Sequence, residues 1–448
     1  MPTLKLTKKY DRYPKYKDSG VKWVGEIPEG WGLMRVKYLA PIRDEKYVFP
    51  NDGTPYVGLE HVESQTGKHI EPDEPVVPES IVNRFEINDV LFGKLRPYLA
   101  KVLHASFEGY CTGELLVMVP GKIIPRYLYY KMLDPSFVNN VNVSTYGARM
   151  PRASWNFIGN QYFAYPDEQT QKNIAACLDE KTVLIDAIIE KKKKQIELLR
   201  EKRAAIINRA VTKGLPARRS LGEGGDTNAK LVDSGIEWIG KIPEGWEVKR
   251  LKYIANVQAS NVDKNTNEGD SEVLLCNYVD VYKNEYITAN LNFMKSTATH
   301  DQVRKVGLVP GDVLITKDSE TADDIGVPAL VKDSVANLVS GYHLYVMKPV
   351  RSLMVGDYLL RFLQSSYVHA SFETSSNGVT RFGLGAQKVK DLQVLVPSMF
   401  EQKKIALYVN EKAEVADCAV NKIEVSIKQL QEFKSALISH VVTGKVKV

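Results

Sequence analysis

The feature that most constrains this chain is a long segment, free of proline and glycine, that occurs twice. The first copy spans residues 168–212, and its apolar residues recur at alternating steps of three and four. This spacing is typical of a helix that packs against another helix along one seam. A continuous helix of this length would extend about 65 Å at ~1.5 Å per residue, which is too long for an internal element of an ordinary domain. The sequence therefore predicts a long helix that needs a partner helix.

The partner is predicted within the same chain. Residues 397–445 repeat the pattern at a spacing of 231 residues, with matches that include Pro166/Pro397, Gln171/Gln402, Asp186/Asp417 and Leu199/Leu430. We interpret the two segments as copies of one helix that pair as an antiparallel coiled coil. The predicted seam consists of Ile189, Ile196, Leu199, Ile206 and Ala210 in the first copy and of Val420, Ile423, Ile427, Leu430, Leu437 and Val441 in the second.

A second repeat lies well upstream of each helix. Residues 18–40 read DSGVKWVGEIPEGWGLMRVKYLA and return at 233–255 as DSGIEWIGKIPEGWEVKRLKYIA, with 14 of 23 positions identical. The identical positions include two tryptophan pairs, Trp23/Trp238 and Trp31/Trp246. In each copy the Pro-Glu-Gly-Trp turn and the apolar stretch after it indicate entry into a strand, with the tryptophan packed beneath. We expect a structural role for this repeat.

The regions between the repeats, roughly 41–165 and 256–396, read as short strands broken by turns and helical patches, so each is an α+β body. Weaker echoes link 89–94 with 312–317, and Gly147 with Gly378. The whole chain is expected to be α+β, with two similar domains separated by two long helices and related by a pseudo-two-fold axis that follows from the internal repeat. The predicted boundaries are a basic arm at 1–17, a first domain at 18–166, a central helix at 167–213, a linker at 214–232, a second domain at 233–397 and a C-terminal helix at 398–448.

Composition sets only wide bounds on function. The chain has 60 basic and 54 acidic residues, and its net charge of +6 is compatible with an anionic partner without requiring one. Its four cysteines show no CxxC spacing, which argues against a disulfide framework or a structural zinc site. No signal-peptide core or membrane-length apolar run occurs, so we expect a cytoplasmic protein without a membrane partner. The arm at 1–17 is basic, which indicates either a solvated tail or a segment that touches phosphates.

The chain repeats its upstream segment and its long helix but not the regions between them. It therefore presents two different surfaces that are held in the same geometry. Double-stranded DNA has the matching symmetry, and paired readers held one or more helical turns apart are a common solution for a split recognition site. The repeat therefore favours DNA as a partner.

These residues resemble a known family. The duplicated DSGxxWxGxIPEGW segment, LFGKLRPYLAKV at 91–102, GARMPRASW at 147–155 and the shared opening of the long helices are similar to the specificity subunit of type I restriction-modification systems, over nearly the whole chain. The resemblance implies two target-recognition domains that bind a bipartite, asymmetric DNA site, and helices that set its spacer and dock partner subunits. It implies a non-catalytic chain that binds no cofactor itself. The implied partners are double-stranded DNA, two modification subunits that methylate adenine with S-adenosylmethionine, and two restriction subunits that use ATP and Mg²⁺.

The second half departs from the family pattern in two places. ITKDSETADD at 315–324 replaces the LFGKLRPY stretch, and TRFGLGAQ at 380–387 lacks equivalents of Pro151, Arg152 and Trp155. Contacts of the first body are therefore not transferred to the second.

The candidate DNA-contacting side chains lie in loops of the two bodies. Arginine forms bidentate hydrogen bonds to guanine edges, and both arginine and lysine neutralise phosphates. The candidates are Lys94, Arg96, Tyr98, Tyr146, Arg149 and Arg152 in the first body and Lys317, Tyr342, Thr380 and Arg381 in the second. A structural ion pair is an equal alternative for each charged residue, and base contacts are not separated from phosphate contacts. The basic run at 191–194 reads as a solvated helix face, because its copy is less basic.

Motifs for catalysis are weak. No GxxxxGK[ST] loop occurs, and Asp134-Pro-Ser-Phe137 has serine where an adenine methyltransferase motif has its second proline. A nuclease-like set of Pro166-Asp167 with Asp179-Glu180-Lys181 is not kept in the copy. There the two aspartates correspond to Ser398 and Asn410, while Glu180 and Lys181 persist as Glu411 and Lys412. Two alternatives to a specificity subunit stay open: a symmetric scaffold that binds proteins or peptides, and a stand-alone methyltransferase or nuclease.

Overall fold

The computed structural model describes residues 11–50, 52–74, 76–78, 81–147, 149–215, 230–237 and 239–448. The first ten residues of the predicted arm, most of the predicted linker (216–229) and Trp238 lie outside the described residues. The chain divides into two compact units, each of mixed helix and strand. Unit 1 is the chain up to Lys193 together with Glu424–Val448, and unit 2 is Lys194–Ile423.

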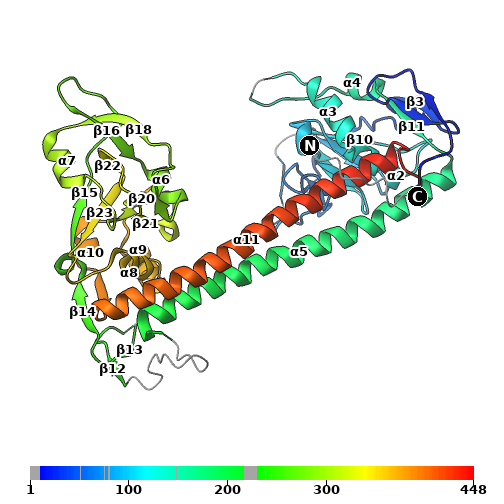
Figure 1. The fold of residues 1–448 in the computed structure, drawn as a ribbon. Helices are drawn as coiled ribbons and strands as arrows, with labels where there is room; N and C mark the ends of the chain where they lie inside the picture. The colour runs from blue at the N-terminus through cyan, green and yellow to red at the C-terminus, as the bar shows by residue number, and fades with distance from the viewer. Residues whose placement is uncertain are drawn as a thin grey trace. The chain divides into compact units, whose positions relative to one another are not determined.

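The two expected long helices are α5 (Glu168–Lys213) and α11 (Met399–Val442) (Figure 1), and one part of each helix belongs to each unit. In unit 1, the Lys434 ammonium donates to both carboxylate oxygens of Asp186, at 2.8 and 2.7 Å. In unit 2, Arg203 Nε lies 3.4 Å from Asp417 Oδ1. The residue number rises along α5 while that of its partner falls along α11, so the helices pair antiparallel. The two ion pairs occupy equivalent positions of the repeat, because both acids and both bases are 231 residues apart.

The predicted seam lies in the helix pair and is buried to different degrees. Ile189, Ile196 and Leu437 are buried, as are Ala210 and Val441. The other seam residues are half-buried, because a pair of helices alone covers only one side of each side chain; they are Leu199, Ile206, Val420, Ile423, Ile427 and Leu430. Ile185, Ile207 and Ile438 were not predicted, yet they are buried, in the same clusters as residues of the bodies.

Unit 1 has a three-stranded sheet in the order β10-β7-β8, a four-stranded sheet in the order β4-β6-β9-β5, and the strand pairs β1-β2 and β3-β11. Its elements are β1 (Tyr16–Asp18), β2 (Glu26–Pro28), β3 (Gly32–Arg35), α1 (Val36–Leu39), β4 (Lys46–Tyr47), β5 (Tyr56–Val57), β6 (Val82–Phe85), β7 (Val90–Gly93), the 3-10 helix η2 (Pro97–Leu99), β8 (Val102–His104), β9 (Gly109–Thr112), β10 (Leu115–Met118), α2 (Pro125–Leu133), α3 (Pro135–Val143), α4 (Trp155–Asn160) and β11 (Tyr162–Tyr165). Proline opens α2 and α3 at a position where its missing N–H costs no helix hydrogen bond.

Unit 2 has a five-stranded sheet in the order β15-β23-β19-β21-β17, a three-stranded sheet in the order β18-β16-β22, and the strand pairs β12-β13, β14-β25 and β20-β24. Its elements are β12 (Leu231–Asp233), β13 (Lys241–Pro243), β14 (Glu247–Arg250), η3 (Leu251–Tyr253), β15 (Ala255–Ala259), β16 (Ser271–Cys276), α6 (Tyr278–Lys283), β17 (Tyr286–Ile287), β18 (Met294–Ala298), α7 (His300–Val306), β19 (Val313–Thr316), β20 (Asp318–Ser319), η4 (Ala322–Asp324), β21 (Pro328–Val331), β22 (Leu338–Ser340), β23 (Leu344–Pro349), α8 (Gly356–Leu363), α9 (Ser366–Ser375), β24 (Phe382–Gly383), α10 (Ala386–Lys390) and β25 (Gln393–Val396).

The upstream repeat forms the same turn in both units. Asp18 Oδ1 accepts a hydrogen bond from Gly20 N at 3.0 Å, and Asp233 Oδ1 accepts one from Gly235 N at 3.0 Å. The tryptophans of the second pair have the expected structural role: Trp31 is buried beside α11 residues in the core of unit 1, and Trp246 Nε1 donates to Glu401 Oε2 at 3.0 Å.

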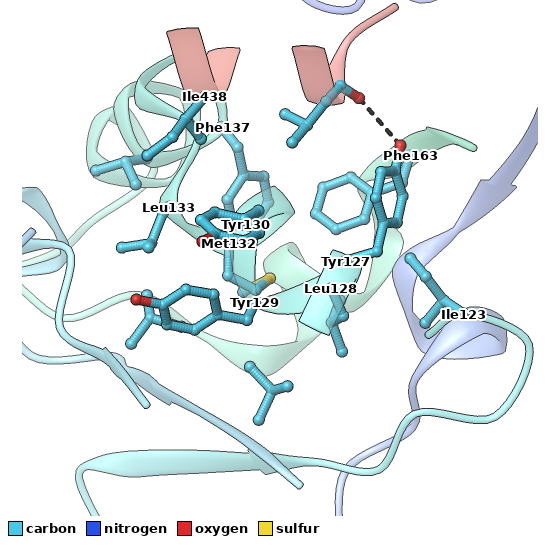
Figure 2. Packing of buried hydrophobic residues seen from close by; sticks show 14 of the residues in the cluster. Ile123, Tyr127, Leu128, Tyr129, Tyr130, Met132, Leu133, Phe137, Phe163 and Ile438 are labelled. Carbon is cyan, nitrogen blue, oxygen red and sulfur yellow. Dashed lines mark hydrogen bonds between the residues drawn. The ribbon is translucent and has the colours of Figure 1, made fainter. Parts of the chain in front are cut away.

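The body of unit 1 joins α11 through α2, whose aromatic residues fill the core (Figure 2). The Tyr127 hydroxyl and the Lys131 ammonium both donate to the carbonyl of Val442, the last residue of α11, at 3.1 Å each. Burial lowers the pKa of Lys131 to about 8 and raises the pKa of Tyr127. These bonds satisfy a carbonyl that the helix end leaves without a partner within the helix.

Candidate nucleic-acid interface

In unit 1, a short hairpin is fastened to the chain that leaves β7. Lys94 N donates to Glu114 O at 3.0 Å, and Lys94 O accepts from Ala153 N at 2.9 Å. Tyr146 and Arg152 exchange main-chain hydrogen bonds of 3.2 and 3.0 Å, which close the hairpin. We call residues 146–152 hairpin 1; Ala148 within it lies outside the described residues.

Unit 2 builds the same frame after β19. Lys317 N donates to His343 O at 2.8 Å, and Lys317 O accepts from Leu384 N at 2.9 Å. Asn377 and Gly383 exchange main-chain hydrogen bonds of 3.1 and 2.9 Å. We call residues 377–383 hairpin 2. The weak echoes in the sequence therefore mark one backbone frame that both units share, although hairpin 2 lacks equivalents of Pro151 and Arg152.

A glycine opens the turn of each hairpin. Gly378 has a φ of +149°, and a Cβ there would lie 1.9 Å from the carbonyl oxygen of Arg381. Gly147 has a φ of +91° and a Cβ there would lie 3.2 Å from the carbonyl oxygen of Met150. Backbone of this kind favours glycine because it has no Cβ, so the echo between these two glycines has a steric cause.

The candidate side chains of unit 1 gather on this frame. Arg96 adopts a left-handed backbone with a φ of 50°, held by a 2.7 Å hydrogen bond from its N–H to Pro151 O, and its side chain is exposed. Arg149 and Tyr146 are both exposed in hairpin 1, Tyr146 by 65%. Lys94 is half-buried, and Tyr98, in η2 just after Arg96, is 47% exposed.

Arg152 is held differently from the other arginines of unit 1. Its Nε and Nη2 donate to the two carboxylate oxygens of Glu114, at 3.2 and 2.9 Å. This bidentate pair ties hairpin 1 to the segment that links β9 and β10 and occupies the face of the guanidinium that would recognise a base. The geometry therefore favours a positioning role for Arg152.

In unit 2 the candidates form one cluster around hairpin 2. The Lys317 ammonium donates to Tyr342 O at 3.1 Å and lies 4.1 Å from the centroid of the Tyr342 ring, which is half exposed. Thr380 is exposed at the hairpin tip. Arg381 Nη2 donates to Asp318 Oδ1 at 2.6 Å, and its side chain is 61% exposed.

Three residues of these clusters escaped prediction: Glu114, Asp318 and His343. Glu114 and Arg152 are 38 residues apart, and Asp318 and Arg381 are 63 apart, so only the fold brings the partners together. The acidic character of 315–324 was a visible signal, but without the fold it indicated only a departure from the family pattern.

One aspartate of each weak catalytic motif caps a helix, namely Asp134 and Asp167. Asp134 is buried and accepts a hydrogen bond from Ser136 N at 3.1 Å at the start of α3. Asp167 accepts from Thr170 N and Oγ1, at 3.0 and 2.7 Å, just before α5, and these bonds lower the pKa of its carboxyl. Such caps satisfy the free N–H groups of a first helical turn.

Among the described residues, no helix is both long and apolar enough to cross a membrane.

Comparison with known proteins gives a consistent result. No family model matches the chain. The chain is 22% identical over 335 residues to the type I restriction enzyme MjaVIII specificity subunit of Methanocaldococcus jannaschii, an alignment that covers 72% of this chain and 70% of that protein. It is 22% identical over 326 residues to the type I restriction enzyme EcoBI specificity subunit of Escherichia coli, covering 72% of this chain and 65% of that protein.

A solved structure shares the fold. It comes from work on the complex assembly and conformational transition of the type I R-M system, with a TM-score of 0.69 and 15% identity over 93% of this chain and 98% of the solved chain. The mixed helix and strand fold with two long helices is therefore one that a solved structure also adopts. By sequence, the chain is a homologue of the specificity subunits of type I restriction enzymes.

Proposed function

We propose that this chain is the DNA-recognition subunit of a type I restriction-modification complex and that it reads a bipartite, asymmetric site. Each unit would read one half of the site through its hairpin and the neighbouring loop after β7 or β19. Homology to specificity subunits supports the proposal, and so does the distribution of exposed cationic side chains on both hairpins.

The single observation that carries the proposal is a repeated backbone frame with different side chains. Hairpins 1 and 2 are closed and anchored by equivalent main-chain hydrogen bonds. At the tips, however, hairpin 1 exposes Arg149 and Met150, whereas hairpin 2 exposes Thr380 and Arg381 in the same places. Base sequence is read by side chains at the edges of base pairs, so two identical frames with different side chains suit two different half-sites.

In this proposal the chemistry belongs to partner chains. Two modification subunits would methylate adenine with S-adenosylmethionine, and two restriction subunits would use ATP and Mg²⁺, while this chain binds no cofactor. We place the complex in the cytoplasm. The long helices are the proposed docking surface and determine the spacer between the half-sites.

A selection from random duplex DNA, with the purified chain and its modification subunits, tests the proposed function. We expect enrichment of two short fixed sequences separated by a spacer of constant length. Binding should weaken steeply as salt rises, because each neutralised phosphate releases condensed counterions. Failure to enrich any two-part sequence would overturn the proposal, and binding that is insensitive to salt would favour a protein-binding scaffold.

A further inference from the structure

We propose that Asp318 and His343 form a clamp that holds Arg381 for recognition of a guanine in the half-site read by unit 2. The inference rests on the proposed function and adds to it a residue, a base and a positioning device. Among the described residues of unit 1 nothing corresponds to the clamp, so we assign it to one half-site alone.

The carboxylate of Asp318 is the centre of the clamp. Its Oδ1 accepts from Arg381 Nη2 at 2.6 Å, and its Oδ2 lies 2.8 Å from His343 Nδ1, which donates because a carboxylate only accepts. The Asp318 side chain is only 14% exposed, and β20 pairs with β24 of hairpin 2 at this residue. The acceptor is therefore rigid, and both of its oxygens are used.

Arg381 combines a fixed end with a free end. Its hydrogen bond to Asp318 uses Nη2 alone, and no bond to Nε or Nη1 is seen within the part of the chain that the structure describes. The side chain remains 61% exposed, near the end of hairpin 2. A guanidinium held on one side keeps donors in a fixed plane, and that plane matches the O6 and N7 acceptors of guanine in the major groove.

The other charged side chains of this cluster already have partners within the unit, which leaves Arg381 as the side chain proposed to contact a base. The Lys317 ammonium is turned back onto the carbonyl and ring of Tyr342. The nearby acid Asp324 accepts from the Tyr282 hydroxyl at 2.6 Å. Each oxygen of the Asp318 carboxylate already has a hydrogen-bond partner, which assigns Asp318 the role of positioning Arg381 rather than of accepting from a cytosine amino group.

Unit 1 provides a contrast on the same frame. Leu95 pairs with Arg152 where Asp318 pairs with Gly383, and Met150 stands where hairpin 2 has Arg381. The apolar Leu95 cannot hold a guanidinium. Hairpin 1 instead carries Arg149 one position earlier, and the only carboxylate-arginine pair described there, Glu114 with Arg152, lies at the base of the hairpin. The two units therefore use arginine in different ways.

The test is a map of methylated adenines on genomic DNA treated with the full complex, compared among matched variants of this chain. Arg381→Ala should remove a guanine preference of roughly 5- to 150-fold at one position of one half-site and leave the other half-site unchanged. Arg381→Lys keeps the positive charge but not the planar pair of guanidinium donors, so it should lose most of the same guanine preference. Asp318→Asn and His343→Gln should weaken that preference at the same position by a smaller factor. Arg149→Ala serves as the control and should alter only the other half-site.

Several results would overturn the clamp. An Arg381→Lys complex with an unchanged motif would show a phosphate contact, as would an Arg381→Ala complex that binds all sequences more weakly and with a smaller salt dependence. If a variant no longer methylates, selection of bound DNA by the same complex gives the motif directly. An unchanged half-site of unit 1 in the Arg381, Asp318 and His343 variants shows that the chain is folded and assembled. Absence of any motif with the unmodified chain would instead contradict the proposed function.

Discussion

Replacement of Glu285 by glutamine is expected to lower the free energy of unfolding of unit 2 by about 3 kcal/mol, because it leaves a buried arginine without its carboxylate. Arg361 is 1% exposed, and its Nη2 lies 2.8 Å from Glu285 Oε1. Glu285 also pairs with Arg203 of α5 and accepts from Gln364 at 2.8 Å. Burial alone would raise the pKa of Glu285, but the two arginines outweigh it and bring the pKa below its usual value.

The sign of the pH dependence follows from that lowered pKa. The stabilisation from Glu285 is present above the pKa of the unfolded chain and is lost as pH falls through the lower folded value. The difference between the unmodified chain and Glu285→Gln should therefore shrink in acid. Hydrogen exchange of α8 backbone amides, followed at several pH values, measures it. An equal deficit at every pH, or none, would contradict this account.

Unit 1 offers a control in a more exposed carboxylate–arginine pair, which involves Asp179 of α5. There Asp179 accepts from Arg126 and from Tyr130, at 2.7 and 2.6 Å, and its side chain is 40% exposed. Asn410 stands at the equivalent position of α11. Because Asp179 is partly solvated, Asp179→Asn should cost only about 1 kcal/mol, and the loss should appear in unit 1 alone.

Replacement of Gln402 by methionine is the second change with a large expected effect, again about 3 kcal/mol in unit 2. The Gln402 side chain is fully buried; it accepts from Val355 N at 2.9 Å and donates to the carbonyls of Pro397 and Leu353, each at 2.9 Å. Methionine fills similar space but removes the side-chain partner of these three main-chain groups, of which the Pro397 carbonyl lies in a buried bond.

The repeat supplies a second measurement of the same bond network. Gln171 makes two of these bonds in unit 1, accepting from Ile124 N and donating to Pro166 O, both at 2.9 Å. Gln171→Met should therefore cost about 2 kcal/mol, in unit 1. The exposed Gln169 is the control, and its replacement should change stability by less than about 0.5 kcal/mol. Chemical denaturation of all three variants decides the matter; equal effects at positions 169 and 171 would contradict the structural equivalence.

The long helices and the repeated turn could be predicted because their signals are local. Spacing of apolar residues marks a helix seam, and the Asp-Ser-Gly turn and Pro-Glu-Gly-Trp segment carry their own hydrogen bonds and packing. The extra burial of Ile185, Ile207 and Ile438 could not be predicted, because it depends on which body residues pack on the helix pair.

In the candidate clusters the sequence indicated the arginines, lysines, tyrosines and Thr380, but not the side chains that hold them. What these residues do depends on partners that are distant in sequence: Glu114 for Arg152, and Asp318 with His343 for Arg381. The contacts between the bodies and the long helices differ between the units, and they too depend on residues that are distant in sequence. Tyr130 and Asp179 of unit 1 correspond to Arg361 and Asn410 of unit 2. A neutral donor on the body with an anionic acceptor on the helix is thus replaced by a cationic donor with a neutral acceptor, and only the fold shows that each pair forms a hydrogen bond.

The most direct test of the central claim is a map of methylated adenines made with two complexes that differ only in residues 41–165 of this chain. One complex carries the natural body, and the other carries the corresponding body of a homologous specificity subunit. We predict that one half-site changes completely, while the second half-site and the spacer length stay the same. A site that changes in both halves, or that does not change at all, would contradict the claim that each unit reads its own half of a split DNA site.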